Sequence, residues 1–168
     1  MQTIVPNLWF DTQSEEAAKY YVEVFSNRIG SAGRAKSEIL NVSHYPQDVG
    51  NKKAGDVLTA EFQLEGQRFI AINGGPEFTF DEAVSFLVNC ESQEEIDELW
   101  DKLVEGGGEH GPCGWLKDKF GLSWQIAPTG MDEMLTGPNK EGAQRAFAAM
   151  MEMKKIDLAE LQRAYAGK

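Results

Sequence analysis

The alternation of hydrophobic and polar residues in the first half of the chain predicts a strand, a helix and a β-hairpin. An apolar run over residues 3–10 predicts a buried strand, and apolar residues at helical spacing predict a helix over 14–25. Strict alternation over 57–64, a Glu-Gly turn and a second apolar stretch over 68–73 predict the hairpin. The polar, glycine-containing stretch 41–55 before this hairpin indicates a long loop.

The second half of the chain repeats this order. A strand is expected over 83–90, a helix over 92–104, and the two strands of a second hairpin over 114–116 and 122–127. Both predicted helices begin with consecutive glutamates, which suit the positive end of a helix. A supersecondary unit used twice implies that the two copies bury their apolar sheet faces together, so we expect a single domain over residues 1–168.

The last part of the chain, 131–168, has a different pattern. Its apolar positions recur at helical spacing and predict two helices, the second capped by Asp157. Phe147, Met150 and Met151 fall at i, i+3 and i+4, so they share one helix face and would form an exposed apolar stripe if nothing covered it. Either the sheet of the same chain or a second subunit would cover the stripe, and we expect a homodimer.

Composition then narrows the classes of partner. The chain has 168 residues and a formal net charge of -11, which disfavours binding to nucleic acid and to anionic membrane surfaces. Cys90 and Cys113 lack the spacing of a disulfide framework or a zinc site. The sequence shows neither a signal peptide nor an apolar run of the roughly 18 residues that cross a bilayer. We therefore expect a cytoplasmic protein whose partner is a small molecule or another protein chain.

Four segments carry a resemblance to a known family. They are Leu8-Trp9-Phe10-Asp11, Phe69-Ile70-Ala71-Ile72-Asn73-Gly74-Gly75-Pro76, Ala83-Val84-Ser85-Phe86-Leu87-Val88-Asn89-Cys90 and Cys113-Gly114-Trp115-Leu116-Lys117-Asp118-Lys119-Phe120-Gly121-Leu122-Ser123-Trp124-Gln125. Together they resemble the PhnB-like branch of the glyoxalase/bleomycin-resistance/dioxygenase (vicinal oxygen chelate) superfamily. The resemblance implies an α+β fold with two tandem βαβββ modules, at about 3–76 and 81–129, whose curved mixed sheets surround a cavity. It also implies a homodimer. The two modules are followed by the C-terminal helices, at about 131–168, that the apolar spacing predicts.

The resemblance also bears on cofactors. Enzymes of the superfamily hold a divalent metal at positions that fall near Pro6 and Ala71 in the first module and near Ala83 and Gln125 in the second. Such a metal needs imidazole or carboxylate donors, and none of these four residues provides one. We therefore expect no bound metal. Many members of the branch are named 3-demethylubiquinone-9 3-methyltransferase. No strand-to-helix turn of this chain carries a glycine-rich loop that would cradle a nucleotide-like cofactor, so we expect no cofactor either.

Aromatic and amide side chains are the best candidates for ligand contact. Aromatic rings in a curved-sheet pocket supply flat apolar walls for an aromatic or quinone-like compound. Core packing is the alternative, and for Trp124 both interpretations are equally compatible with the sequence. Asn73 and Gln125, at matching ends of the two hairpins, need a hydrogen-bond partner from the protein or from a ligand. The candidate ligand-binding residues are Trp9, Asn73, Phe78, Cys113, Trp115, Trp124 and Gln125.

The remaining polar candidates have plainer interpretations. His44 and His110 both stand in predicted loops and are expected at the surface, although His110 could flank the pocket of the second module as an acid–base group. Cys113 has no activating His or Asp pattern around it, which favours a structural thiol over a nucleophile. The charged turn 117–119 is expected to face solvent.

These observations favour a metal-free protein that binds a small hydrophobic or aromatic compound. The alternative is an enzyme of the same superfamily, a lyase, a dioxygenase or the named methyltransferase, acting on a small aromatic or quinone-like substrate. The missing metal ligands favour binding, whereas stoichiometric metal in protein purified without chelator would favour catalysis.

Overall fold

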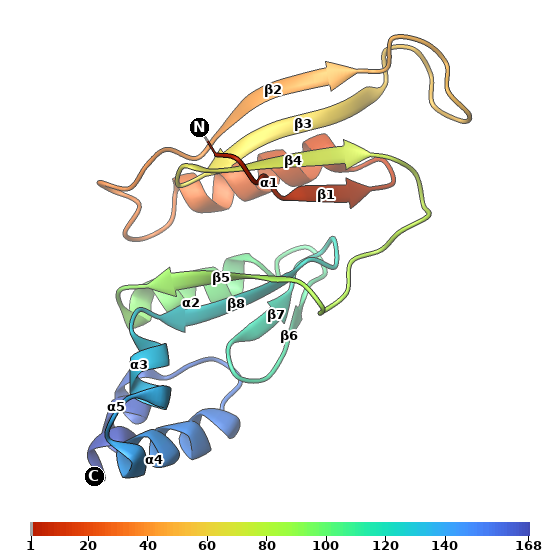
Figure 1. Ribbon diagram of the computed structural model, residues 1–168. Helices are drawn as coiled ribbons and strands as arrows, with labels where there is room; N and C mark the ends of the chain where they lie inside the picture. Colours follow the sequence, from red (N-terminus) through yellow and green to blue (C-terminus); the bar gives the residue numbers. More distant parts are fainter. Residues whose placement is uncertain (1) are drawn as a thin grey trace. The chain divides into compact units, whose positions relative to one another are not determined.

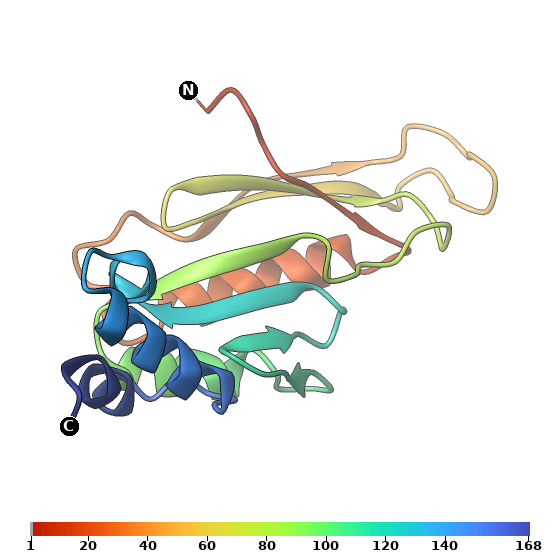
Figure 2. The ribbon, with the colours of Figure 1, turned by 60° about the horizontal axis from the view of Figure 1, so that its bottom comes forward.

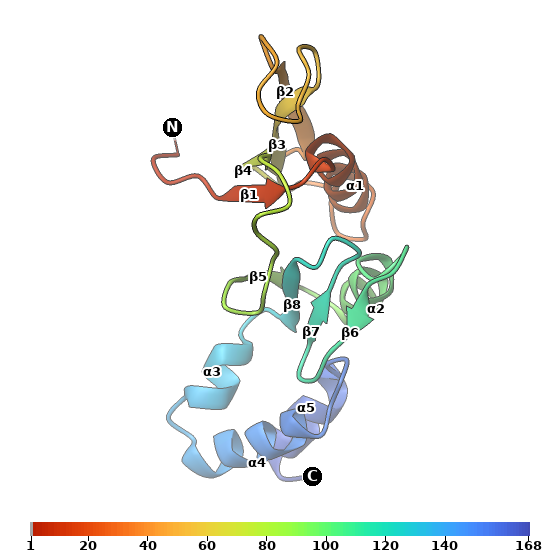
Figure 3. The same cartoon turned by 90° about the vertical axis from the view of Figure 1, so that its right-hand side faces the viewer.

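The computed structural model describes residues 2–168 as two compact units, which divide after Phe80 (Figure 1). Unit 1 is the part up to Phe80, and unit 2 is the part from Asp81 to Lys168. Each unit contains a four-stranded mixed sheet with a helix, which confirms the α+β class expected from the sequence. Within each unit the helix lies on one face of that unit's own sheet (Figure 3).

Unit 1 has the order strand, helix and three strands. Its elements are β1 (Asn7–Phe10), α1 (Ser14–Ser26), β2 (Glu38–His44), β3 (Val57–Leu64) and β4 (Gln67–Asn73). The sheet order is β1-β4-β3-β2, with β1 parallel to β4 and the other pairs antiparallel. The expectation that 41–55 is entirely loop was wrong, because β2 continues through His44. Its side chains alternate only weakly in burial at the sheet edge, so its sequence lacks a strand pattern.

The core of unit 1 lies between α1 and the sheet. Tyr21 of α1 is fully buried and stacks on Phe62 of β3, with ring centroids 6.0 Å apart. Phe62 stacks in turn on Phe69 of β4 at 5.3 Å. Alternate residues of β3 and β4 are therefore buried against α1, while their neighbours in the sequence lie on the opposite face.

Unit 2 begins with a second copy of this arrangement. Its first elements are β5 (Ser85–Cys90), α2 (Gln93–Lys102), β6 (Glu109–His110), β7 (Trp115–Lys117) and β8 (Ser123–Pro128). The sheet order β5-β8-β7-β6 repeats that of unit 1, again with one parallel pair, β5 and β8. The Ser92 side chain caps α2 by accepting a hydrogen bond from Glu95 N at 3.3 Å. The two-residue strand β6 had no recognisable pattern in the sequence.

The C-terminal helices pack within unit 2. They are α3 (Met131–Thr136), α4 (Lys140–Met151) and α5 (Leu158–Ala166), one more than the sequence predicted (Figure 2). The predicted cap of α5 is confirmed, since the Asp157 carboxylate accepts a hydrogen bond from Glu160 N at 2.8 Å. The buried residues at the centre of this helical cluster are Ala146, Met150, Ile156 and Leu161. None of the helices within residues 2–168 has the length and apolarity needed to cross a membrane.

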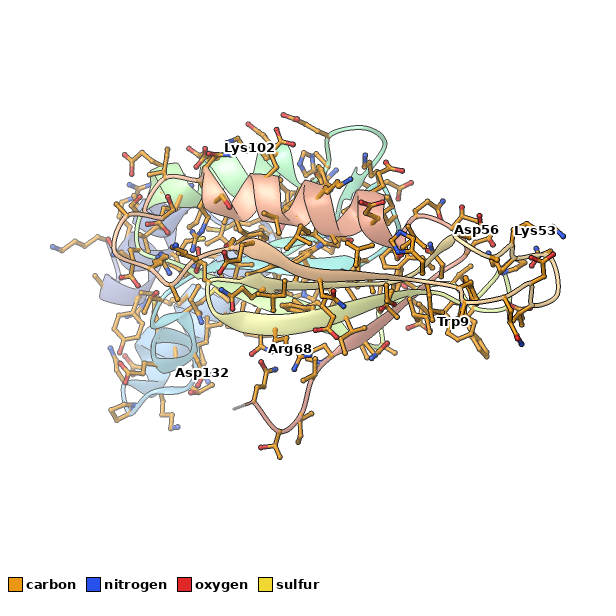
Figure 4. All side chains as sticks on the ribbon, turned by 90° about the horizontal axis from the view of Figure 1, so that it is seen from above. Trp9, Lys53, Asp56, Arg68, Lys102 and Asp132 are labelled. Carbon is orange, nitrogen blue, oxygen red and sulfur yellow. The ribbon has the colours of Figure 1, made fainter. Side chains whose placement is uncertain are left out.

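The long loop between β2 and β3 is a closed hairpin extension of the sheet. Tyr45 N donates to Asp56 O at 2.8 Å, so the loop ends are paired at its base, and Lys53 lies at the far end of the loop in Figure 4. Lys52 turns back and donates to Asp11 O at 2.7 Å. The Tyr45 hydroxyl donates to Asn73 O at 2.7 Å, which ties the loop to the end of β4.

Candidate functional site

Each sheet has one face that is not covered by the helix packed on it, α1 in unit 1 and α2 in unit 2. We term this face the open face of the sheet. In β7 and β8 of unit 2, cross-strand pairing places Trp115 beside Gln125 and Lys117 beside Ser123 on the open face. Glu109 of β6 pairs with Lys117 and continues the second row. Paired residues of neighbouring strands point to the same side of a sheet, so the pairing brings aromatic, amide and charged groups together.

A pocket of about 440 Å³ lies at this side of unit 2. Its volume suits a small organic molecule. The wall is the turn between β6 and β7, and the floor comes from the strands themselves. The lining residues are Glu82, Glu109, His110, Gly111, Pro112, Trp115, Leu116, Lys117 and Ser123.

Charged groups mark the rim of this pocket. The Lys117 ammonium forms an ion pair with the Glu82 carboxylate. Hydrogen bonding to Lys117 lowers the pKa of Glu82, and the same contact raises the pKa of Lys117, with a further contribution from Glu109. Both groups are therefore charged at neutral pH. Ser123 Oγ on β8, in contrast, is buried and has no hydrogen-bond partner among residues 2–168.

Trp115 and Gln125 lie side by side on the open face of unit 2. Trp115 is half-buried on the open face and lines the pocket. Gln125, its cross-strand partner, is also half-buried and donates through Nε2 to Ser85 Oγ at 2.8 Å. Its amide oxygen accepts no hydrogen bond from the described residues, so it can accept one from a ligand.

Trp124 instead faces the core of unit 2. It is 2% exposed, and its indole N–H donates to Asp118 Oδ2 at 2.9 Å. Asp118 is itself buried, and its Oδ1 accepts from the backbone N–H groups of Phe120 and Leu122. The expectation of a wholly solvent-facing turn at 117–119 was therefore wrong at its central residue, because the carboxylate is needed to satisfy three donors.

Cys113 is not among the residues that line the pocket, whereas His110 is one of them and also contacts α2. Cys113 Sγ lies 3.6 Å from Met150 O and is half-buried against the C-terminal helices. His110 stacks on Trp100 of α2, with ring centroids 4.4 Å apart, and its Nε2 lies 2.9 Å from Trp100 O. His110 is exposed, as expected, although it belongs to a short strand rather than a loop.

The candidates in unit 1 do not gather in the same way. Asn73 is buried on the α1 side, where Oδ1 accepts from Ser14 N at 2.8 Å and Nδ2 donates to Val57 O at 3.0 Å. Its hydrogen bonds are thus made within the protein. Asn73 and Gln125 do not occupy matching positions, because Asn73 lies on the helix-covered face of its sheet and Gln125 lies on the open face of the other sheet. Trp9 packs edge-on against Phe78 at 5.1 Å, and Phe78 is 65% exposed.

The positions implied for a metal do not form a ligand set. Ala71 is fully buried against α1, and Ala83 lies before the start of β5. Across residues 2–168, no three His, Cys, Asp or Glu side chains come together in a group that could hold a metal ion. His44 is exposed at the end of β2 and has no such neighbours in that range.

Seven of the residues that line the pocket were not singled out from the sequence. Four of them are polar, Glu82, Glu109, Lys117 and Ser123, and the others are Gly111, Pro112 and Leu116. Lys117 was assigned to a charged turn, and Ser123 to a strand without a role. The signal that could have found them is the two-residue alternation of a strand, because Lys117 and Trp115 share one face, as do Ser123 and Gln125. Glu82 and Glu109 carry no such signal.

Comparisons with known proteins fit this fold. The sequence profile of the family described as 3-demethylubiquinone-9 3-methyltransferase matches residues 2–127. A PhnB protein from Bacillus cereus is 36% identical in sequence, with a TM-score of 0.60, and the match covers 74% of this chain and 98% of that one. Protein PA1353 from Pseudomonas aeruginosa, at 19% identity and a TM-score of 0.57, covers 76% and 98%. A search of curated proteins gave no significant match.

Proposed function

Because the chain belongs to the 3-demethylubiquinone-9 3-methyltransferase family, which is the PhnB-like branch of the glyoxalase/bleomycin-resistance superfamily, we propose that it binds a small aromatic compound in the pocket of unit 2. The observation that carries the proposal is the pocket of about 440 Å³ lined by Trp115 and Pro112. An apolar hollow with a few polar groups at its edge is the usual form of a small-molecule site.

The lining divides the ligand's contacts into two parts. The Trp115 ring and the Pro112 ring offer apolar contact to a flat ring system. The rim groups Lys117, Glu82 and Glu109 offer hydrogen bonds to a polar substituent. The Gln125 amide oxygen, beside Trp115, adds an acceptor. A planar compound with one polar edge fits this arrangement better than a long aliphatic chain.

Titration with phenylnaphthylamine, an uncharged aromatic dye whose fluorescence rises in apolar sites, tests the proposal. The protein should bind the dye with a dissociation constant of about 10–100 μM, as expected for a ligand of this size. Trp115→Leu should weaken binding about tenfold, since it removes the aromatic wall. Phe120→Leu changes a half-buried aromatic residue of unit 2 outside the lining and is the matched control. Equal affinity of all three proteins would refute the site.

The metal content separates the proposed binding protein from an enzyme. For the binding protein, elemental analysis of protein purified without chelator should show well under one divalent ion per chain. Gln125→Glu should raise metal affinity only slightly, because no group of further donors exists among residues 2–168. A tightly held stoichiometric ion would support the enzyme and count against the metal-free binding protein.

We further propose that the chain forms a homodimer through its C-terminal helices. Met150 of the predicted stripe is buried within the helical cluster, but Phe147 and Met151 remain 51% and 54% exposed. Replacing both exposed residues with serine should shift the sedimentation of the chain from dimer to monomer. A wild-type chain that sediments as a monomer at micromolar concentration would exclude the dimer.

A further inference from the structure

The turn that forms the wall of the pocket has a left-handed backbone conformation at two residues. In the turn between β6 and β7, Trp115 N donates to Pro112 O at 3.0 Å and Gly111 N donates to Trp115 O at 2.8 Å. Between these bonds, Cys113 and Gly114 both have positive φ, 54° and 81°. A left-handed conformation is unfavourable for a residue with a side chain such as Cys113, so it persists where the surroundings enforce it.

The C-terminal segment 150–156 supplies this support. Cys113 N donates to Met153 O at 2.8 Å, and Gly114 N donates to Lys154 O at 2.7 Å. The approach is close, because a Cβ on Gly114 would stand 3.1 Å from Ile156 Cγ1. The two residues with left-handed backbone are therefore the two that hydrogen-bond to the C-terminal segment.

The same segment is fastened to the other side of unit 2. Gln93 of α2 donates through Nε2 to Ile156 O at 3.0 Å and accepts through Oε1 from Leu158 N at 2.8 Å. The Lys155 ammonium lies 2.6 Å from Asp97 of α2 and lowers the pKa of that carboxyl group. Ile156 is fully buried in the helical cluster. Residues 153–156 thus connect α2, on the helix face, with the turn that forms the pocket wall.

From these contacts we infer that segment 150–156 positions the pocket wall, and that Gln93 acts through it as a positioning residue for ligand binding. The inference rests on the proposed function of the pocket and adds what holds its shape. The segment lies beyond residue 127, where the family match ends, so this support is an addition to the part of the chain that the family shares. Gln93 itself does not line the pocket.

The first test compares two variants that each remove two hydrogen bonds from a side chain to backbone groups. Gln93→Ala removes the bonds to Ile156 O and Leu158 N, and a third bond to Asp97 within α2, while the Lys155–Asp97 ion pair stays in place. Arg145→Ala removes the bonds from Arg145 to Ala164 O and Tyr165 O within the C-terminal helices. Gln93→Ala should weaken phenylnaphthylamine binding about fivefold, as expected when the hydrogen bonds that hold a wall are lost. Arg145→Ala should leave the affinity within about twofold.

The second test needs no ligand. Hydrogen exchange of the Cys113 and Gly114 amides reports directly on their bonds to the C-terminal segment. In the full chain, Gln93→Ala should speed exchange of both amides about tenfold or more, while Arg145→Ala should not. Trp124, elsewhere in the core of unit 2, gives the reference amide, and its protection should remain unchanged in both variants.

The two measurements separate the two proposals. Unchanged exchange at Cys113 and Gly114 in Gln93→Ala would overturn the positioning role, whatever the dye does. Faster exchange with unchanged dye affinity would also overturn it, because the wall would then not govern binding. Faster exchange in a protein that does not bind the dye at all would uphold the support of the wall and refute the proposed site. Faster exchange together with weaker binding is the expected result.

Discussion

The two units build the same sheet but complete their open faces differently. In unit 1 two pairs of polar side chains bond to each other on that face: Ser43 bonds to Thr59 at 2.6 Å, and Arg68, labelled in Figure 4, bonds to Glu61 at 2.6 Å, although Arg68 Nε is buried without a partner among residues 2–168. In unit 2, Lys117 pairs with Glu82 at the rim of a pocket, and the Gln125 amide oxygen accepts no hydrogen bond from residues 2–168. One topology therefore carries paired polar side chains on the open face of unit 1 and the proposed ligand pocket on that of unit 2.

The tryptophans of the two open faces show the same contrast. Trp9 of unit 1 donates its indole N–H to Gly75 O at 2.8 Å, and its ring occupies the space where a Cβ of Gly74 would lie. Trp115 of unit 2 is half-buried and lines the pocket, and its indole N–H donates to no residue within 2–168. The indole N–H of Trp9 is therefore bonded within the protein, whereas Trp115 is the residue proposed to contact a ligand.

The largest expected effect on the free energy of unfolding comes from Asp118, in the turn between β7 and β8 of unit 2. Asp118→Ala would leave the N–H groups of Phe120, Leu122 and Trp124 without their carboxylate acceptor. The free energy of unfolding, measured in urea, should fall by about 4 kcal/mol, since bonds to a charged acceptor are the stronger ones. Asp118→Asn keeps an acceptor oxygen and should lose less than half of this. An equal loss in both variants would mean that charge matters more than hydrogen bonding.

A smaller effect is expected at the buried amide of unit 1. Asn73→Ala removes the acceptor of Ser14 N and the donor to Val57 O, so two buried backbone groups lose their partners. The free energy of unfolding should fall by about 2–3 kcal/mol. Hydrogen exchange should show the loss at the start of α1. If amide protection there stays unchanged, Asn73 does not hold α1 to the sheet.

Replacing the tryptophans of the two open faces should change the free energy of unfolding less, and by different amounts in the two units. Trp9→Phe removes the hydrogen bond to Gly75 O and should lower the free energy of unfolding by about 1 kcal/mol. Trp115→Phe removes no hydrogen bond to residues 2–168 and should change the free energy of unfolding by less than about 0.5 kcal/mol. Thermal and urea denaturation measure both. A larger loss at Trp115 would make that residue part of the core rather than of a site.

The smallest expected effect is a pH dependence of the Glu82–Lys117 pair. The folded pKa of Glu82 lies below its ordinary value of 4.5, so the stabilisation is complete above that value and is lost as the pH falls through the folded pKa. The effect should be slight, because both groups are exposed and screened. Melting temperatures of wild type and Glu82→Gln, measured from neutral to acid pH, should converge at the acid end. Parallel curves would show that the pair contributes nothing.

Local patterns determined most of the two-module fold. The helix predicted over 14–25 is α1, Ser14–Ser26, and both predicted hairpins are present. Their signals are periodicities of neighbouring residues, which do not depend on distant contacts. The patterns failed where the periodicity is weak: at β2, whose side chains are mostly exposed, at the two-residue strand β6, and at α3, which has no buried residue.

The site followed from the sequence only in part, and the reason is physical. Alternation along a strand was enough to suggest Trp115 and Gln125, because pairing puts them on one face. It could not tell whether Asn73 or Trp124 would bond to the protein or to a ligand, since Ser14 and Asp118 reach them only in the folded chain.

What the sequence by itself determined is therefore the strand, helix and hairpin of each half and their order, because hydrophobic periodicity is a property of each segment alone. Only the tertiary structure decided which polar groups are already satisfied and which remain available. Cys113 shows the difference most directly. Its hydrogen bond to Met153 O joins residues 40 positions apart, and such a contact leaves no periodic trace in either segment.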